Sequence, residues 1–275
     1  MISPTLVVDA PLAHWRWLPP AAASSGRCVV LLHGVGGGRD AWGAGLSSTG
    51  SVLAAAGFEV LALDLPGYGL SAPLDPCTLA GMAQAVQALI AASRPAGAAV
   101  VVGHSMGGMV AQSLIALNPA RVSALVLAGT SPAFGKPDGD WQRGFLQSRF
   151  APLDAGVGMA GLAASLVPSM VGPGTSPAVM AAAQALMAGV PEAGYRRAVA
   201  ALVGFDGRAQ LAAIAVPTLV ITGECDATAP PELARRMAER IAGAQCVILA
   251  GAGHLLTMEQ PDAFNTAVLA FLQRH

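Results

Sequence analysis

Three polar residues that together could carry out nucleophilic catalysis each follow an apolar run of the chain. The first is Ser105, in the glycine-rich stretch Gly103–Gly108, between the apolar run Ala98–Val102 and a helix-like segment. A tight strand-to-helix turn projects such a serine hydroxyl, and its flanking glycines let neighbouring backbone approach. The hydroxyl becomes a nucleophile only when a base removes its proton, and the base needs an orienting acid.

His254 is the expected base and Asp226 the expected acid. His254 comes directly after the last apolar run, and Asp226 follows the run Thr218–Thr222. Glu224 and Asp64, which also follow apolar runs, are the competing acids. The remaining histidines are less suited to this role. His14 lies in an expected edge strand, His33 in a glycine-rich turn and His275 at the C-terminus. His104 is next to the serine, but its ring is expected to point elsewhere.

Two backbone N–H groups are expected to bind the oxyanion that forms when a serine attacks a carbonyl. One is that of Met106, the residue after the serine, and the other comes from the glycine-rich loop after Cys28–Leu32. Val35 is the expected donor of that loop, with Gly36 as the alternative. The same loop is similar to a dinucleotide-binding GxGxxG fingerprint, but Arg39 stands where the third glycine belongs. Since Walker A motifs and metal-ligand spacings are also missing, no cofactor and no metal are expected.

The elements that must position these residues are short runs with an apolar residue at every position. Such runs are typical of parallel strands covered on both faces, and helix-like segments follow them. The expected strands are Cys28–Leu32, Val60–Leu63, Ala98–Val102, Ala124–Ala128, Thr218–Thr222 and Cys246–Ala250, with edge strands at Thr5–Val8 and His14–Leu18. The expected helices are Leu46–Ala56, Leu79–Ala92, Met106–Leu117, Pro231–Ile241 and Pro261–Leu272. The sequence therefore predicts an α/β fold with an open, mostly parallel sheet and helices on both faces, in which the carboxyl ends of the strands gather the site residues.

The alternation of strands and helices stops between Ser131 and Gly207. Helix-like pieces without a convincing strand occur there, around Trp141–Phe150, Met159–Val167, Ala178–Met187 and Tyr195–Phe205. We expect a helical lid at 131–207, inserted late in the chain between two parts of the core at 1–130 and 208–275.

Composition limits the partners of the chain. Its 275 residues include Lys+Arg 15 and Asp+Glu 16, so no basic field exists for nucleic acid. Only 11% are charged, but prolines break the longest uncharged stretch, Ala155–Pro191, into pieces too short to span a membrane. The N-terminus lacks a basic region before an apolar run, and the four cysteines are far apart, so we expect a cytoplasmic protein with reduced thiols.

Together these motifs resemble the α/β-hydrolase family of serine esterases and lactonases, from about Arg27 to the C-terminus. The order Ser105, Asp226, His254 is the chain order of that family. Other marks of the resemblance are Leu32-His33-Gly34, Asp64–Ser71, Gly223–Asp226 and Gly253–Pro261. A serine at the nucleophile position argues against haloalkane dehalogenases and epoxide hydrolases, which carry aspartate there. The passage from Pro191 to Thr218 looks like the corresponding passage of 3-oxoadipate enol-lactonases.

The resemblance implies a serine hydrolase that cleaves a small carboxylic ester or lactone through an acyl-enzyme. 3-Oxoadipate enol-lactone is a candidate substrate, and Arg196 or Arg197 could supply its counter-charge, although both could equally be solvated. Trp141 could line the pocket. The alternatives are a carbon-carbon bond hydrolase of ring-cleavage products, a cofactor-free perhydrolase and, more distantly, a non-catalytic ligand-binding protein.

Overall fold

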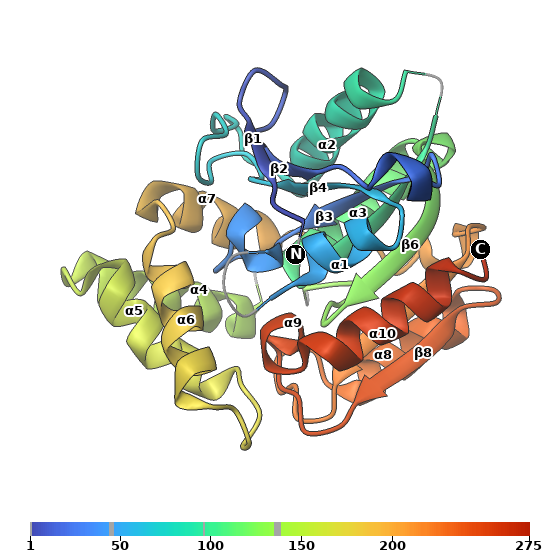
Figure 1. Ribbon diagram of the computed structural model, residues 1–275. Coiled ribbons are helices and arrows are strands. Elements are labelled where there is room, and N and C mark those ends of the chain that lie inside the picture. The colour runs from blue at the N-terminus through green and yellow to red at the C-terminus, as the bar shows by residue number, and fades with distance from the viewer. Residues whose placement is uncertain (1, 44–46, 96, 135–138) are drawn as a thin grey trace.

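The computed structural model describes residues 2–43, 47–95, 97–134 and 139–275. Its strands are β1 (Thr5–Val7), β2 (His14–Trp17), β3 (Cys28–Leu32), β4 (Glu59–Leu63), β5 (Ala99–His104), β6 (Val122–Ala128), β7 (Thr218–Gly223) and β8 (Gln245–Leu249). They form one eight-stranded sheet in the order β1-β2-β4-β3-β5-β6-β7-β8 (Figure 1). The pairs β1–β2 and β2–β4 are antiparallel, and every pair from β4 to β8 is parallel.

The strands β3 to β7 are buried along almost their whole length because helices cover both faces of the sheet. In β3, Cys28, Val30 and Leu32 belong to one buried cluster, and Val29 and Leu31 belong to the other. The first cluster includes residues of α2 (Leu79–Ser93), α3 (Met106–Leu117) and α8 (Pro231–Arg240), and the second includes residues of α1 (Thr49–Ala55) and α10 (Pro261–Leu272). A residue of either parity along a strand therefore meets a hydrophobic layer.

The predicted fold is confirmed as an open, mostly parallel α/β sheet with helices on both faces. All eight expected strands occur, with ends that differ from the expected ones by at most two residues. Helix α1 begins at Thr49, and Leu46, where the sequence placed its start, lies outside the described residues. Helix α8 ends at Arg240, one residue before the expected end.

Four helices lie between β6 and β7, beside one end of the sheet (Figure 1). They are α4 (Asp140–Asp154), α5 (Gly158–Leu166), α6 (Pro177–Ala188) and α7 (Glu192–Leu202). We refer to residues 131–207 as the helical segment. Among its described residues the only β-type pairing is an isolated bridge between Ala133 and Asp206. The division of the chain into a core and a lid stays a prediction.

The long uncharged stretch of the helical segment is interrupted where the sequence predicts. Helix α5 gives way to a 3-10 turn at Val167–Ser169, which contains Pro168. Helix α6 begins after Ser176, whose hydroxyl accepts a hydrogen bond from the N–H of Val179, and Pro177 occupies its first position. No described helix has both the length and the hydropathy needed to cross a membrane.

Candidate active site

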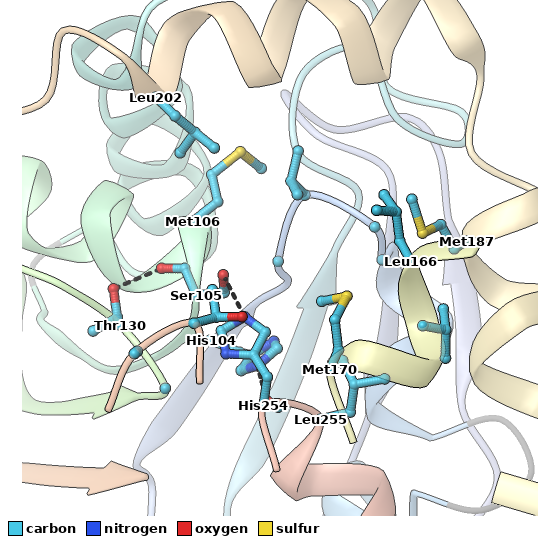
Figure 2. Close-up of a pocket in the computed structure, with 18 of the residues that line it drawn as sticks. His104, Ser105, Met106, Thr130, Leu166, Met170, Met187, Leu202, His254 and Leu255 are labelled. Carbon is cyan, nitrogen blue, oxygen red and sulfur yellow. Dashed lines mark hydrogen bonds between the residues drawn. The ribbon is translucent and has the colours of Figure 1, made fainter. Parts of the chain in front are cut away.

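Ser105 lies in a strained turn between β5 and α3. Its φ of 53° makes it the only positive-φ residue other than glycine in the described chain. A Cβ on Gly103 would lie 2.3 Å from the carbonyl oxygen of Gly107, and one on Gly107 would lie 2.2 Å from that of Leu32. The hydroxyl of Thr130 donates to the Ser105 carbonyl oxygen over 2.7 Å (Figure 2). Both glycines are therefore needed for the turn that presents the serine.

The three residues expected to do the chemistry meet at the carboxyl ends of β5, β7 and β8. Nε2 of His254 is 3.0 Å from Oγ of Ser105, and Nδ1 of His254 is 2.9 Å from Oδ2 of Asp226 (Figure 2 shows the serine and the histidine). Because an ionised carboxylate only accepts, Nδ1 carries the proton of a neutral imidazole. Nε2 is then the acceptor for the serine hydroxyl, as a general base requires.

Asp226 is buried and fully hydrogen-bonded. Its Oδ1 accepts from the N–H groups of Thr228 and Ala229, both over 2.8 Å, and its Oδ2 accepts from Thr222 Oγ1 over 3.2 Å as well as from His254. Burial acts to raise the pKa of this carboxyl, but the bonds from His254 and the two N–H groups outweigh it, so that the pKa is lowered. The acid is therefore ionised and fixed in direction at neutral pH.

His104 supports the loop that carries His254. Its Nε2–H donates to the His254 carbonyl oxygen over 2.8 Å, and the two rings are 5.0 Å apart. Burial, together with the nearby His254, lowers the pKa of His104 to about 3. His104 therefore stays neutral and acts as a hydrogen-bond donor to the loop.

Glu259, in the short helix α9 (Leu256–Glu259), is a site residue that the sequence analysis missed. Its Oε1 accepts from the N–H of Leu255, and its Oε2 accepts from the N–H of Gly253, at 3.0 Å in both cases. The same Oε2 accepts from the N–H of Gly172 over 2.6 Å and from Thr175 Oγ1 over 2.8 Å. One carboxylate thus joins the His254 loop to the helical segment. A glutamate five residues after the histidine was the only sequence signal for it.

The competing acids have other partners. Asp64 forms a buried ion pair with Arg39 and accepts from the N–H groups of Arg39 and Leu70, each over 3.0 Å. Glu224 accepts from the N–H of Gly251 over 2.9 Å and is exposed. Among the described residues, neither forms a hydrogen bond or an ion pair with a histidine, and the contacts of both are structural.

His33 has the structural role expected from its turn. Its Nε2 accepts from the N–H of Leu65 over 3.1 Å, so Nδ1 carries the proton and donates to the Gly34 carbonyl oxygen over 2.8 Å. The ring therefore ties the loop after β3 to the loop after β4.

Val35 and Met106 both line the pocket that contains Ser105. As the first residue of α3, Met106 has an N–H that cannot bond within the helix. Within the described chain the N–H of Val35 has no backbone acceptor, while its carbonyl accepts from the Tyr68 hydroxyl over 2.9 Å. Both N–H groups are therefore available to an oxyanion.

The pocket has a volume of about 300 Å³ and lies between the sheet loops and the helical segment. Its wall is mostly apolar; labelled examples in Figure 2 are Leu166, Met170, Met187 and Leu202. Among the described residues, no group of three or more His, Cys, Asp or Glu side chains could hold a metal ion. The cavity suits a small organic molecule.

Of the three expected substrate contacts, only Trp141 lines the pocket; Arg196 and Arg197 do not. The Arg196 guanidinium pairs with Asp154 and Glu192, at 2.8 Å from each, and Arg197 is exposed. The arginine on the pocket wall is instead Arg149, which the sequence analysis did not consider.

Comparison with known proteins agrees with the fold. The model of the alpha/beta hydrolase family matches residues 29–267, and the chain belongs to that family. It is a hydrolase by its family, and its relatives include esterases, an enol-lactonase and a candidate carbamate hydrolase.

The relatives differ in substrate. The chain is 34% identical to the candidate carbamate hydrolase RutD of Variovorax paradoxus, over 95% of this chain and 96% of that one. It is 31% identical to a pimeloyl-[acyl-carrier protein] methyl ester esterase of Pectobacterium carotovorum, over 89% of this chain and 94% of that one. The enol-lactonase of Burkholderia xenovorans superposes with a TM-score of 0.80 at 26% identity, over 98% of this chain and 100% of that one. A 32% identical match to the polyketide synthase ThaQ of Burkholderia thailandensis spans only 10% of that protein.

Proposed function

We propose that the protein is a serine hydrolase that cleaves a small carboxylic ester or lactone through an acyl-enzyme. The observation that carries this proposal is the pair of hydrogen bonds that links Ser105 to His254 and His254 to Asp226 at the pocket. Such a chain can move a proton off the serine while the developing imidazolium is stabilised. The available N–H groups of Val35 and Met106 add a place for the oxyanion.

In the first half of the proposed reaction, Oγ of Ser105 attacks the carbonyl carbon and His254 Nε2 takes the hydroxyl proton. The carbonyl oxygen becomes an oxyanion held by the N–H groups of Val35 and Met106. When the tetrahedral intermediate collapses, the ester C–O bond breaks and His254 gives its proton to the leaving alkoxide. An ester releases an alcohol at this stage, whereas a lactone opens and stays attached.

In the second half, water attacks the acyl-enzyme with His254 again as the base. The carboxylic acid leaves, and the proton returns to Ser105. Asp226 keeps Nδ1 of the imidazole protonated and offsets the positive charge that His254 carries in both halves. The helical segment acts as a lid that walls the cavity and limits access of bulk water.

3-Oxoadipate enol-lactone is the specific substrate we propose to test. The support is the structural likeness to the enol-lactonase of Burkholderia xenovorans over nearly the whole chain. The carbamate hydrolase and the pimeloyl-ester esterase are also relatives of this chain, so the fold does not distinguish among these substrates. Which substrate is cleaved depends on the residues that line the pocket.

The test measures kcat/KM for 3-oxoadipate enol-lactone and for p-nitrophenyl butyrate with one enzyme preparation. Ser105→Ala is the control, because it removes the nucleophile and keeps the pocket. We expect turnover of at least one substrate and its loss by about 10⁶-fold in the control. Equal rates for Ser105→Ala and the unaltered protein would refute the serine mechanism. Turnover of the neutral ester alone would refute only the lactone assignment.

A further inference from the structure

Charge is distributed unevenly over the wall of the pocket. Arg149 of α4 is the only described lining residue with a permanent charge, and no described aspartate or glutamate lines the cavity. The other lining groups are apolar side chains, hydroxyls, backbone and the two histidines His104 and His254. A single cation in a low-dielectric cavity favours a ligand with one negative charge.

The guanidinium of Arg149 is held in place without being neutralised. It lies over the ring of Phe145, 4.8 Å from the centroid, and its Nη1 donates to Ser148 Oγ over 3.1 Å. None of the ion pairs in the described chain includes Arg149. The half-buried side chain therefore presents an uncompensated positive charge.

Nearby arginines show what a purely structural arginine does in this protein. Arg196 of α7 is bound by the carboxylates of Asp154 and Glu192. Arg39, at the other side of the site, is paired with Asp64. Both are neutralised and neither lines the pocket, which sets Arg149 apart.

Tyr195 of α7 lies next to this cation. It is 1% exposed, it lines the pocket, and its hydroxyl has no hydrogen-bond partner within the described chain. Burial raises the pKa of Tyr195 to about 12 against the opposing effect of the Arg149 charge. The phenol is therefore protonated at neutral pH and can donate a hydrogen bond beside the guanidinium.

We propose that the substrate carries a carboxylate remote from its scissile ester, and that Arg149 binds this carboxylate with Tyr195 as a second donor. This inference rests on the proposed serine-hydrolase function. A carboxylate has one charge and accepts from a guanidinium and a phenol together, whereas a phosphate monoester would bring a second, uncompensated charge. The portion between ester and carboxylate is hydrocarbon, because the rest of the wall is mostly apolar.

Matched pairs of esters test this proposal. One pair is p-nitrophenyl hexanoate and the mono-p-nitrophenyl ester of adipic acid, which have acyl groups of equal carbon number and differ by the terminal carboxylate. Corresponding pairs with acyl groups of five and eight carbons vary the distance between the ester and the terminal carboxylate. Phenyl butyrate and 4-carboxyphenyl butyrate place the carboxylate on the alcohol side. Each ester is assayed with the unaltered protein, with Arg149→Gln and with Arg197→Gln, which removes an exposed arginine outside the pocket.

We expect the unaltered protein to prefer the anionic member of at least one pair. Arg149→Gln should lower kcat/KM for that member by about 10- to 100-fold, and leave its neutral partner within about threefold. Arg197→Gln should leave both members within about threefold. Equal effects of Arg149→Gln on both members, or no preference in any pair, would overturn the inference while the serine-hydrolase proposal stands. Absence of turnover for all these esters and for the enol-lactone would instead remove the proposed function, and this inference with it.

Discussion

The turn that carries Ser105, at the carboxyl end of the sheet, and the exposed surface of the helical segment differ in how closely other atoms pack against their glycines. At the sheet end, a Cβ on Gly103 or Gly107 would lie less than 2.5 Å from another backbone oxygen. In the helical segment, a Cβ on Gly144, Gly156 or Gly174 would meet nothing within 4 Å. The serine turn has no room for a methyl group at either glycine. The helical segment has room at these three exposed positions, whereas its Gly172 and Gly194, where it contacts the rest of the molecule, are as closely packed as the serine turn.

We expect the tightly packed region to hold the reacting groups and the helical segment to select the substrate. The reacting groups need positions defined to a few tenths of an ångström, which backbone contacts and satisfied buried hydrogen bonds provide. The helical segment contributes pliable side chains such as Met170 and Met187, whose flexible thioethers adapt to varied shapes. We therefore expect changes at the sheet end to affect kcat for every substrate, and changes in the helical segment to affect the choice among substrates.

Among variants that keep the serine, the largest effect is expected for Asp226→Asn. An amide cannot stabilise the imidazolium and favours the wrong tautomer of His254, so kcat should fall by about 10⁴-fold for any ester that is turned over. Circular dichroism and kcat/KM measured on one sample would check this. Glu224→Gln, in the same loop but exposed, is the matched control and should remain within about threefold. A nearly silent Asp226→Asn beside a severe Glu224→Gln would show that the acid is wrongly assigned.

The next effect contrasts one added methyl group in the two regions. Gly107→Ala places a Cβ against the Leu32 carbonyl oxygen and should lower the free energy of unfolding by at least about 3 kcal/mol. Gly144→Ala lies in the interior of α4 in open space and should raise it by up to about 1 kcal/mol through helix propensity. Urea denaturation of both variants measures these changes. Similar losses in both would contradict the proposed difference between the regions.

The smallest effect concerns the free energy of unfolding at acidic pH. We expect its decrease to come largely from the buried His104, at the carboxyl end of the sheet. His104 has a folded-state pKa of about 3 against 6.5 in the unfolded chain, because it is buried. Between these values the unfolded chain binds a proton that the folded protein does not, so stability falls as pH falls. The slope is at most about 1.4 kcal/mol per pH unit for each such histidine, and His33 and His14, with lowered pKa values, add in the same direction.

Urea denaturation at pH 7.5, 6.0 and 5.0 gives this slope and stays above the range in which Asp226 titrates. His104→Gln should reduce the slope, even though it also removes a hydrogen bond and lowers stability at every pH. An unchanged slope in His104→Gln would show that this histidine is not held neutral by burial.

The sequence was sufficient to predict the sheet and the three residues at its carboxyl end. Parallel strands bring their carboxyl ends to one edge, so order along the chain became proximity in space for Ser105, Asp226 and His254. The pocket wall was not predictable in the same way. Whether Arg149 or Arg196 faces the cavity depends on how α4 and α7 are rotated about their axes and which face each helix turns to the pocket. Each helix carries more than one arginine, so the sequence alone does not decide which arginine faces inward.

The contacts of Glu259 and His104 depended on tertiary structure as well. Glu259 binds two segments that are far apart in the chain, and His104 bonds to a carbonyl 150 residues away. Neither contact produces a periodic pattern or a local motif. Residue types alone could suggest that His104 is not the base, but not what it does instead.

The shared carboxylate of Glu259 makes the position of the His254 loop depend on the docking of the helical segment. Gly172, 87 residues before it, and the His254 loop both depend on the same Oε2 atom, and the N–H of His254 also donates to the Met170 carbonyl oxygen over 2.6 Å. A molecule with a complete sheet but an undocked helical segment would lack these anchors for the loop that carries its histidine. The position of His254 therefore depends on the docked helical segment as well as on the sheet.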